Sequence, residues 1–311
     1  MRECRYSRRE FLKIAGAVAG GAAAPGGASP LHAALSPSVA VATASGGSPG
    51  ENAKKAVAAL GGMGAFVSRG DVVVVKPNIG WDRTPEQAAN THPEVVVAVA
   101  EMCLAAGAKS VRVFDRTCNE PRRCYASSGI QEAVERFAKA HHAGDMLRVY
   151  HVEDRKFVRT AIPGALVLSE WELYRDALEA DRIVNVPIAK HHTLAGITLG
   201  LKNMMGVMGG NRGQIHFRLP ECLADINRRL PSRLTVIDAD RVLLRNGPSG
   251  GNLADVKRFG MAFASADVVA ADVVAAQKIF GQKPGEVPHI RKALESGVGI
   301  TSPAQIRLLE G

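Results

Sequence analysis

The feature that most constrains the fold is an alternation between short apolar runs and segments of helical period. The clearest run is 71–76, Asp-Val-Val-Val-Val-Lys, whose four valines suit a strand buried on both faces. Other strand-like runs are 38–44, 110–115, 147–152, 182–187, 234–238 and 259–264; helical segments are 50–60, 93–106, 130–142, 198–207, 220–229 and 267–280. Repeated βαβ units predict an α/β fold with a mainly parallel sheet and helices on both faces, in one lobe or two.

Residues 1–37 have the pattern of an export signal. Residues 7–13, Ser-Arg-Arg-Glu-Phe-Leu-Lys, match the twin-arginine consensus, and a short apolar stretch and a Pro/Gly/Ser-rich region follow. We expect 1–37 to be a twin-arginine signal peptide with its cleavage region and 38–311 to be one α/β domain. The twin-arginine translocase is then a partner, and the expected location is periplasmic or otherwise extracytoplasmic. No transmembrane helix is predicted, because no segment reaches the ~18 apolar residues of a span.

Charge and composition favour an anionic small molecule over nucleic acid. The chain has a net charge of +9, which helps to attract anions. It has no dense run of Lys and Arg, and only 5% of its residues are aromatic. Proteins that read nucleic acid usually show a basic cluster or stacking aromatics, so we expect no nucleic-acid partner.

The cysteines supply no ligand set for an iron–sulfur cluster or structural zinc. None of the five forms a Cys-x-x-Cys pair. Cys118 and Cys124 are close together in a predicted loop. In an oxidising compartment they could form a disulfide, and the alternative is two free thiols, so both states remain open.

Polar residues follow four of the predicted strands. Lys76 and Asn78 follow the first, Asp115 ends the second, residues 190–193 (Lys-His-His-Thr) follow the third, and Asp238 ends the fourth. Ligands of open α/β sheets bind beyond the carboxyl ends of the strands. We therefore expect these residues to share one crevice.

The crevice offers groups for anion binding and proton transfer. Lys76, Lys190 and Lys202 are predicted to bind phosphate or carboxylate, since a buried lysine must pair or lose its charge. His191 is the predicted general acid/base, with Asp115 orienting it. A divalent metal on His191 and Asp115 is an alternative that no ligand spacing supports.

Other residues are predicted to position the ligand. Asn78, His192, Thr193 and Asn203 belong to this set. His92 lies beside the start of the helix at 93, where the helix dipole favours an anion, and Thr91 with Glu94 is expected to form a capping box.

A glycine-rich loop, Asn-Gly-Pro-Ser-Gly-Gly at 246–251, is either a plain turn or an anion cradle. Gly247, Ser249 and Gly250 would provide the cradle. The loop is no P-loop, and the chain has no G-x-G-x-x-G or H-E-x-x-H motif.

The same segments resemble the domain-of-unknown-function 362 family. The matching pieces are 75–78 (Val-Lys-Pro-Asn), 91–96, 190–193 continuing through 200–203, 246–248 and 266–272. Together they span about residues 38–310. The resemblance implies a single-module α/β fold without specifying a reaction. Some relatives carry a ferredoxin-like iron–sulfur module, whose cysteine ladder this sequence lacks.

Two functions are compatible with these patterns. The first is an exported enzyme that acts on an anionic small molecule in a Lys/His/Asp crevice. The second is a non-catalytic periplasmic binding protein or an accessory protein of a redox complex.

Overall fold

The valine run forms an interior strand of the main sheet in the computed structural model, which describes residues 38–311. It is strand β2 (Val72–Pro77), buried from Val73 onward. β2 pairs in parallel with β7 (Arg182–Val186) on one side and with β3 (Ser110–Val113) on the other. Continuous apolar sequence is what a strand covered on both faces requires.

The strands of the main sheet run in the order β12-β1-β11-β10-β7-β2-β3-β4. The bounds not yet given are β12 (Ile306–Glu310), β1 (Val39–Ser45), β11 (Val256–Ser265), β10 (Leu234–Leu243) and β4 (Leu147–Val149). Pairing is parallel except where β11 joins β1 and β10. The predicted mainly parallel sheet is therefore confirmed, with an antiparallel hairpin of β10 and β11 added.

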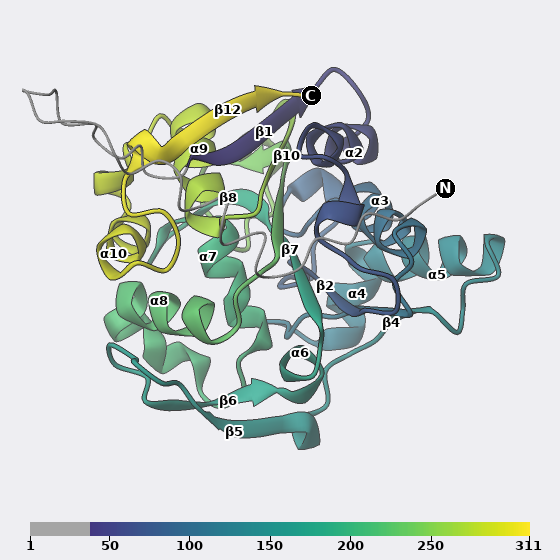
Figure 1. Cartoon of the computed structure of the whole chain (residues 1–311), viewed down its shortest axis with the longest axis horizontal. Coiled ribbons are helices and arrows are strands. Elements are labelled where there is room, and N and C mark those ends of the chain that lie inside the picture. The colour runs from purple at the N-terminus through teal and green to yellow at the C-terminus, as the bar shows by residue number, and fades with distance from the viewer. Residues whose placement is uncertain (1–37) are drawn as a thin grey trace, which may run out of the picture. The chain divides into compact units, whose positions relative to one another are not determined.

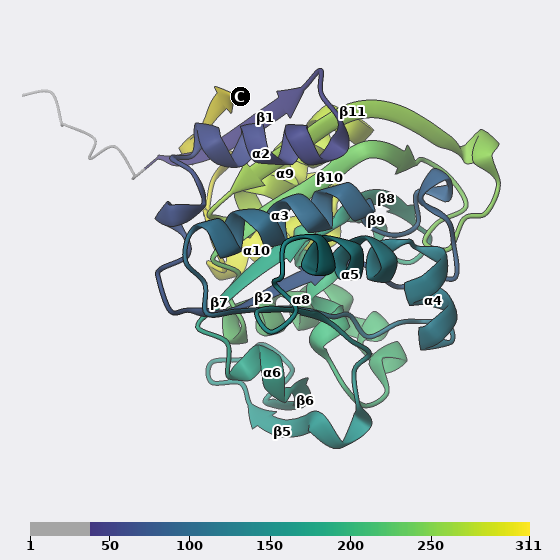
Figure 2. The same ribbon diagram turned by 90° about the vertical axis from the view of Figure 1, so that its right-hand side faces the viewer.

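Helices cover both faces of this sheet, as predicted (Figures 1 and 2). One face carries α2 (Pro49–Ala59), α3 (Pro93–Ala105), α4 (Pro121–Ser127) and α5 (Ile130–Ala140). The other carries α7 (Gly200–Asn203), α8 (Leu219–Arg229), α9 (Val268–Phe280) and α10 (Pro288–Ser296). α9 is almost wholly apolar and buried, because it packs on the sheet and also against α7 and α10.

Three elements differ from the sequence expectations. After Pro187, which has no N–H for the ladder, the chain forms another strand, β8 (Ile188–His192), which pairs with β10 and with β9 (Gly196–Thr198). The predicted helix at 198–207 is instead β9, the single turn α7 and a 3₁₀ helix. β10 continues past Asp238, because β11 pairs with its second half, in which Asp240 and Arg241 interrupt the apolar residues.

A small second sheet lies apart from the main one, near α6 (Arg175–Leu178) and α8 (Figure 1). It consists of β5 (Phe157–Ala161) and β6 (Glu170–Tyr174) in antiparallel pairing. Residues 157–174 thus form a hairpin.

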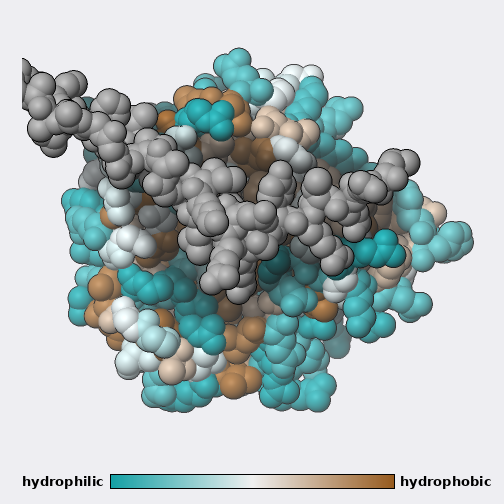
Figure 3. All heavy atoms as spheres, in the orientation of Figure 1, coloured by the Kyte–Doolittle hydropathy of each residue, from teal (hydrophilic) through white to brown (hydrophobic). Residues whose placement is uncertain are grey.

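No helix within 38–311 is long and apolar enough to cross a bilayer. Hydrophilic side chains predominate at the margin of the face seen in Figure 3. The expected twin-arginine signal falls outside the described residues.

Candidate functional site

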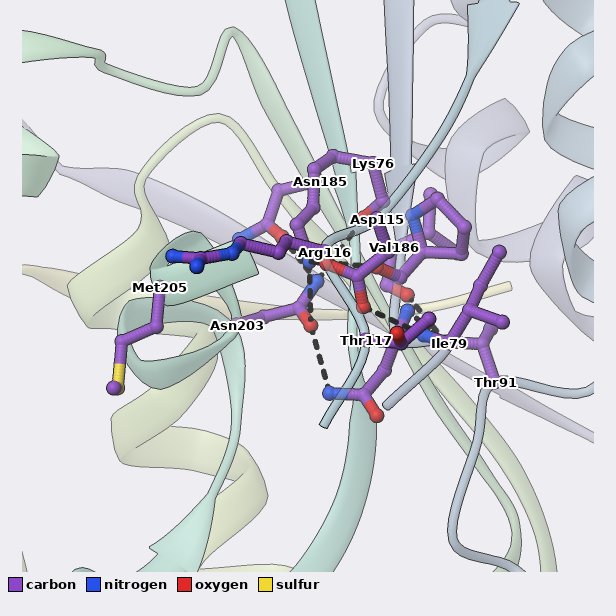
Figure 4. A network of polar contacts seen from close by, with 12 residues as sticks. Lys76, Ile79, Thr91, Asp115, Arg116, Thr117, Asn185, Val186, Asn203 and Met205 are labelled. Carbon is purple, nitrogen blue, oxygen red and sulfur yellow. Dashed lines mark hydrogen bonds and ion pairs between the residues drawn. The ribbon is translucent and has the colours of Figure 1, made fainter. Parts of the chain in front are cut away.

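The carboxyl ends of β2, β7 and β3 bring a group of polar side chains together (Figure 4). Lys76 near the end of β2 lies opposite Asn185 of β7 in the ladder register. Asp115 comes two residues after β3, and Asn203 ends α7. All four side chains are buried, so each of their polar atoms needs a partner inside the protein.

Lys76 and Asp115 form a buried ion pair. Lys76 Nζ lies 2.8 Å from Asp115 Oδ1 and donates to the Pro77 carbonyl at 2.7 Å. Asp115 Oδ2 accepts from the Ile79 amide at 2.7 Å. Burial lowers the pKa of Lys76, and the nearby carboxylate opposes that shift.

Gly206 makes room for this ion pair. A Cβ at Gly206 would lie 1.7 Å from Asp115 Oδ1 and 2.5 Å from Lys76 Nζ. Because no other residue lacks a Cβ, only glycine allows the backbone this close to the pair.

Asn203 links the ion pair to the neighbouring strands. Its Nδ2 donates to the Lys76 carbonyl at 3.0 Å and to Asn185 Oδ1 at 2.8 Å. Its Oδ1 accepts from Lys76 Nζ at 3.2 Å and from Asn78 Nδ2 at 3.0 Å. The amide is fully engaged, which fixes its orientation and that of Asn78.

A cavity of about 530 Å³ opens beside this network. Of the residues predicted from the sequence, its lining includes Asn78, Asp115, Lys190, His192, Thr193, Lys202 and Asn203. The structure therefore brings together most of the predicted crevice. Lys76 lies behind the wall and touches it through Asp115.

Lys190 has no carboxylate partner among the described residues. It is 1% exposed, and its Nζ donates to Asn78 Oδ1 at 3.2 Å and to the Ala89 carbonyl. Burial is the main cause that lowers the pKa of this amine to about 7, and the positive charges of Lys202 and Lys76 add to the effect.

Lys202 is even less well satisfied. It is 8% exposed, and the one contact of its Nζ within 38–311 is with the Met205 sulfur, 2.9 Å away. Burial lowers the pKa of its amine to about 8. Thr198 also lines the cavity, and its buried hydroxyl has no hydrogen-bond partner in the described part of the chain.

Of the two adjacent histidines, only His192 lies where the prediction places it. His191 does not line the cavity; its Nδ1 accepts from the Gly247 amide at 3.1 Å. His192 does line it, and its Nδ1 accepts from the amides of Leu194 and Ala195, both at 3.1 Å. A backbone amide can only donate, so the ring proton of His192 is on Nε2. Burial lowers the pKa of His192 to about 3, which makes it a neutral hydrogen-bond donor.

The metal hypothesis does not fit these residues. Asp115 is engaged by Lys76, and His191 faces the glycine-rich loop. Within 38–311, no group of three or more His, Cys, Asp or Glu side chains is placed to hold a metal ion. Cys118 and Cys124 are free thiols.

Two of the three predicted anion-binding positions in the glycine-rich loop have their amides engaged within the protein. The Gly247 amide is used by His191, and the Gly250 amide donates to the Asn246 carbonyl. Ser249 lines a separate small hollow. The loop holds β8 in place, since the Thr193 hydroxyl donates to the Gly247 carbonyl at 2.7 Å, so the alternative of a plain turn fits better.

His92 and Asp238 lie outside the cavity. His92 itself is the N-cap of α3, accepting from the Glu94 amide, so the predicted capping box at Thr91 is wrong. The Thr91 hydroxyl instead donates to the Val186 carbonyl. Asp238 lies within β10 and accepts from the His92 amide at 2.7 Å. The fourth strand end is therefore absent from the crevice.

Sequence reasoning missed two arginines of the cavity wall. Arg116 donates to the carbonyls of Met208 and Gly210, and Arg212 donates to those of Arg116, Thr117 and Met205. Arg212 lies in the run Gly-Gly-Asn-Arg-Gly at 209–213, a glycine-rich signal that was available in the sequence. Both guanidinium groups raise the positive potential of the cavity.

The order of these site segments matches a known family. The sequence profile of the family described as "Domain of unknown function (DUF362)" matches residues 73–277. The chain belongs to the DUF362 family. The matched region begins in β2 and ends in α9, so it contains the ion pair and both unpaired lysines of the DUF362 domain.

Two known proteins are similar to this DUF362 chain. The "Thylakoid-associated protein sll1697" of Synechocystis sp. is 27% identical over 226 residues, which are 68% of this chain and 64% of that protein. The lactate racemase apoprotein of Thermoanaerobacterium thermosaccharolyticum has a TM-score of 0.45 at 12% identity, over 76% of this chain and 56% of that one. The chain thus spans less than two thirds of the length of either protein.

Proposed function

We propose that this DUF362 domain is an enzyme that acts on an anionic small molecule bound in the cavity. The observation that carries the proposal is the pair of buried amines, Lys190 and Lys202, which line the cavity without a carboxylate partner among residues 38–311. Burying an uncompensated charge costs several kcal/mol. A bound anion would supply the missing negative charge.

The size and chemistry of the cavity support a small ligand. A volume of about 530 Å³ falls within the ~300–1,000 Å³ typical of small-molecule sites. Arg116 and Arg212 add positive charge, and His192 offers a neutral N–H. The one carboxylate in the lining, Asp115, is neutralised by Lys76.

The state of the amines favours catalysis over simple binding. Groups with pKa values near 7 and 8 can both lose and gain a proton at neutral pH, as acid–base catalysts do. A protein that only stored an anion would be served by ordinary, fully charged lysines. The non-catalytic alternative predicts tight retention of a ligand without turnover.

The test is a binding assay on residues 38–311 with sulfate, phosphate and small mono- and dicarboxylates. Lys202→Met should weaken binding about 10- to 100-fold, as expected when ~1.5–3 kcal/mol of a charged hydrogen bond is lost. Lys55→Met, which removes an exposed lysine of α2, is the matched control and should bind as the unmodified domain does. Equal binding by all three proteins would contradict the proposal.

We further propose that the domain works outside the cytoplasm after twin-arginine export. The consensus at residues 7–13 supports this. Cell fractionation should recover a shortened protein outside the cytoplasm, and replacing Arg8 and Arg9 by lysine should retain the precursor inside. Export of that double variant by the same host would contradict the twin-arginine route.

A further inference from the structure

The hydrogen bonds of Lys190 leave its nitrogen with an unused position. A neutral lysine amine has two N–H bonds and one lone pair. The two oxygen acceptors, Asn78 Oδ1 and the Ala89 carbonyl, account for both N–H bonds. With no carboxylate to hold a third proton, the lone pair is available to a ligand in the cavity.

The surroundings of Lys190 suit a molecule with two functional groups. Lys190 on β8 pairs directly with Thr198 on β9, and Thr198 carries the unpartnered buried hydroxyl. Lys202 follows four residues later, and its charge acts on Lys190. A nucleophilic nitrogen therefore lies in the same cavity wall as a hydroxyl and an ammonium group that lack partners.

The three buried lysines are suited to different tasks. Lys76 is held as an ammonium by Asp115, so its nitrogen has no free lone pair. Lys202 has the higher pKa of the two unpaired amines and has no oxygen acceptor within 38–311, so an anion suits it. Lys190 is the amine whose N–H bonds are already satisfied by neutral acceptors.

We propose that Lys190 forms a Schiff base with an oxo acid, whose carboxylate is bound by Lys202 and Thr198. This inference rests on the proposed function and names its substrate class. Lysines with lowered pKa values are suitable nucleophiles for carbonyl carbon.

The step is balanced without an external oxidant or reductant. The lone pair of Lys190 attacks the carbonyl carbon, and the C=O electrons move to oxygen, which takes up a proton as the nitrogen loses one. The carbinolamine then loses its hydroxyl with a second proton as water, and the C=N bond forms. The ammonium of Lys202 can supply the proton for the departing oxygen, and the neutral ring of His192 can donate a hydrogen bond to that oxygen through its Nε2–H.

The test is reductive trapping. The domain is incubated with pyruvate, glyoxylate or 2-oxoglutarate and sodium cyanoborohydride at pH 7.5, and adducts are located by peptide mass spectrometry. Lys190 should carry at least about tenfold more adduct than Lys55, because an ordinary lysine with a pKa of ~10.4 is almost wholly protonated at this pH. Lys190→Arg, which keeps a cation in place, should abolish the adduct, whereas Lys55→Met should leave it unchanged.

Failure of the Schiff-base proposal can be distinguished from failure of the proposed function. Oxo acids that bind, with Lys202→Met weakening the binding but no adduct enriched on Lys190, would overturn the Schiff base and leave the proposed function standing. An absence of anion binding, with adducts spread evenly over surface lysines, would overturn both.

Discussion

Lys76 and Lys202 are both buried lysines of the same domain, yet their surroundings are opposite. Lys76 has a carboxylate, a carbonyl and an amide oxygen within 3.2 Å of its nitrogen. Lys202, like Lys190, has no carboxylate partner among the described residues, and a thioether is its one contact. Burial alone therefore does not identify a functional lysine; the presence or absence of a counter-charge does.

The two regions also belong to different parts of the fold. The Lys76–Asp115 pair joins β2 to the end of β3, within the central parallel strands. Lys190 and Lys202 lie on β8 and α7, where the chain leaves that regular ladder after β7. The regular parallel strands thus support the site, and the segment from β8 to α7 provides its unpaired amines.

The largest effect should come from breaking the ion pair. Asp115→Asn leaves Lys76 buried without its carboxylate, and removing one partner of a buried pair typically costs about 3–5 kcal/mol. Urea unfolding of residues 38–311 measures this loss. Asp145→Asn, at an exposed position, should change the unfolding free energy by less than about 0.5 kcal/mol. Equal stabilities for the two variants would contradict the structural role of the pair.

Gly206→Ala should be next in size. The added methyl group would overlap Asp115 and Lys76, so the pair must move, at a cost of about 1–3 kcal/mol or more. Gly64→Ala is the control, because a Cβ there meets no atom within 4 Å. Thermal unfolding of both variants compares them, and a Gly206 variant as stable as the control would show that the pair is not tightly confined.

Affinity for an anion should depend on pH. Lys190 and Lys202 both attract an anion as ammonium ions, so affinity should be level below about pH 7. It should fall as the pH rises through their pKa values of about 7 and 8, by up to about tenfold per unit for each amine. Sulfate is the suitable probe, since its charge is constant between pH 6 and 9. Lys202→Met should flatten the profile above pH 8. An affinity that stays constant to pH 9 would exclude Lys202 as the anion partner.

The smallest effect should be the change in stability on removing the unpaired charge. Lys202→Met replaces a buried amine by an apolar side chain, and unfolding at pH 7 should show no loss or a gain of about 1 kcal/mol. Lys76→Met is the informative comparison, because it strands Asp115 and should destabilise the domain. Similar losses for both variants would remove the distinction between the two regions.

Much of the fold follows from local sequence. The valines of β2 and the apolar period of α9 determine their own structure, because each is buried on all sides. The extension of β10 beyond Asp238 is not visible locally, since Asp240 and Arg241 interrupt the apolar pattern and the extension depends on pairing with β11. Likewise, nothing near Pro187 indicates that a new strand, β8, follows it.

The sequence predicts which residues gather at the cavity better than it predicts the hydrogen bonds and ion pairs that each of them makes. Lys76, Asp115 and Lys190 could be expected to approach because strand ends meet at one edge of a parallel sheet. Which lysine forms the ion pair with Asp115 depends on the close approach of Gly206, which lies 91 positions after Asp115 in the chain. The His191 ring is held by an amide of the distant loop at 246–251, and the His192 ring by amides of the turn that follows it. These hydrogen bonds decide which of the two rings faces the cavity.

The most direct measurement is a pH titration of the lysine side chains by NMR, using residues 38–311 labelled with ¹³C at lysine Cε and no ligand. Two resonances should titrate near pH 7 and pH 8, and they should be missing from Lys190→Arg and Lys202→Met respectively. That result would establish two buried amines without a counter-charge. If every lysine resonance instead titrates near the ordinary value of ~10.4, the amines are compensated, and the cavity is not the anion site proposed.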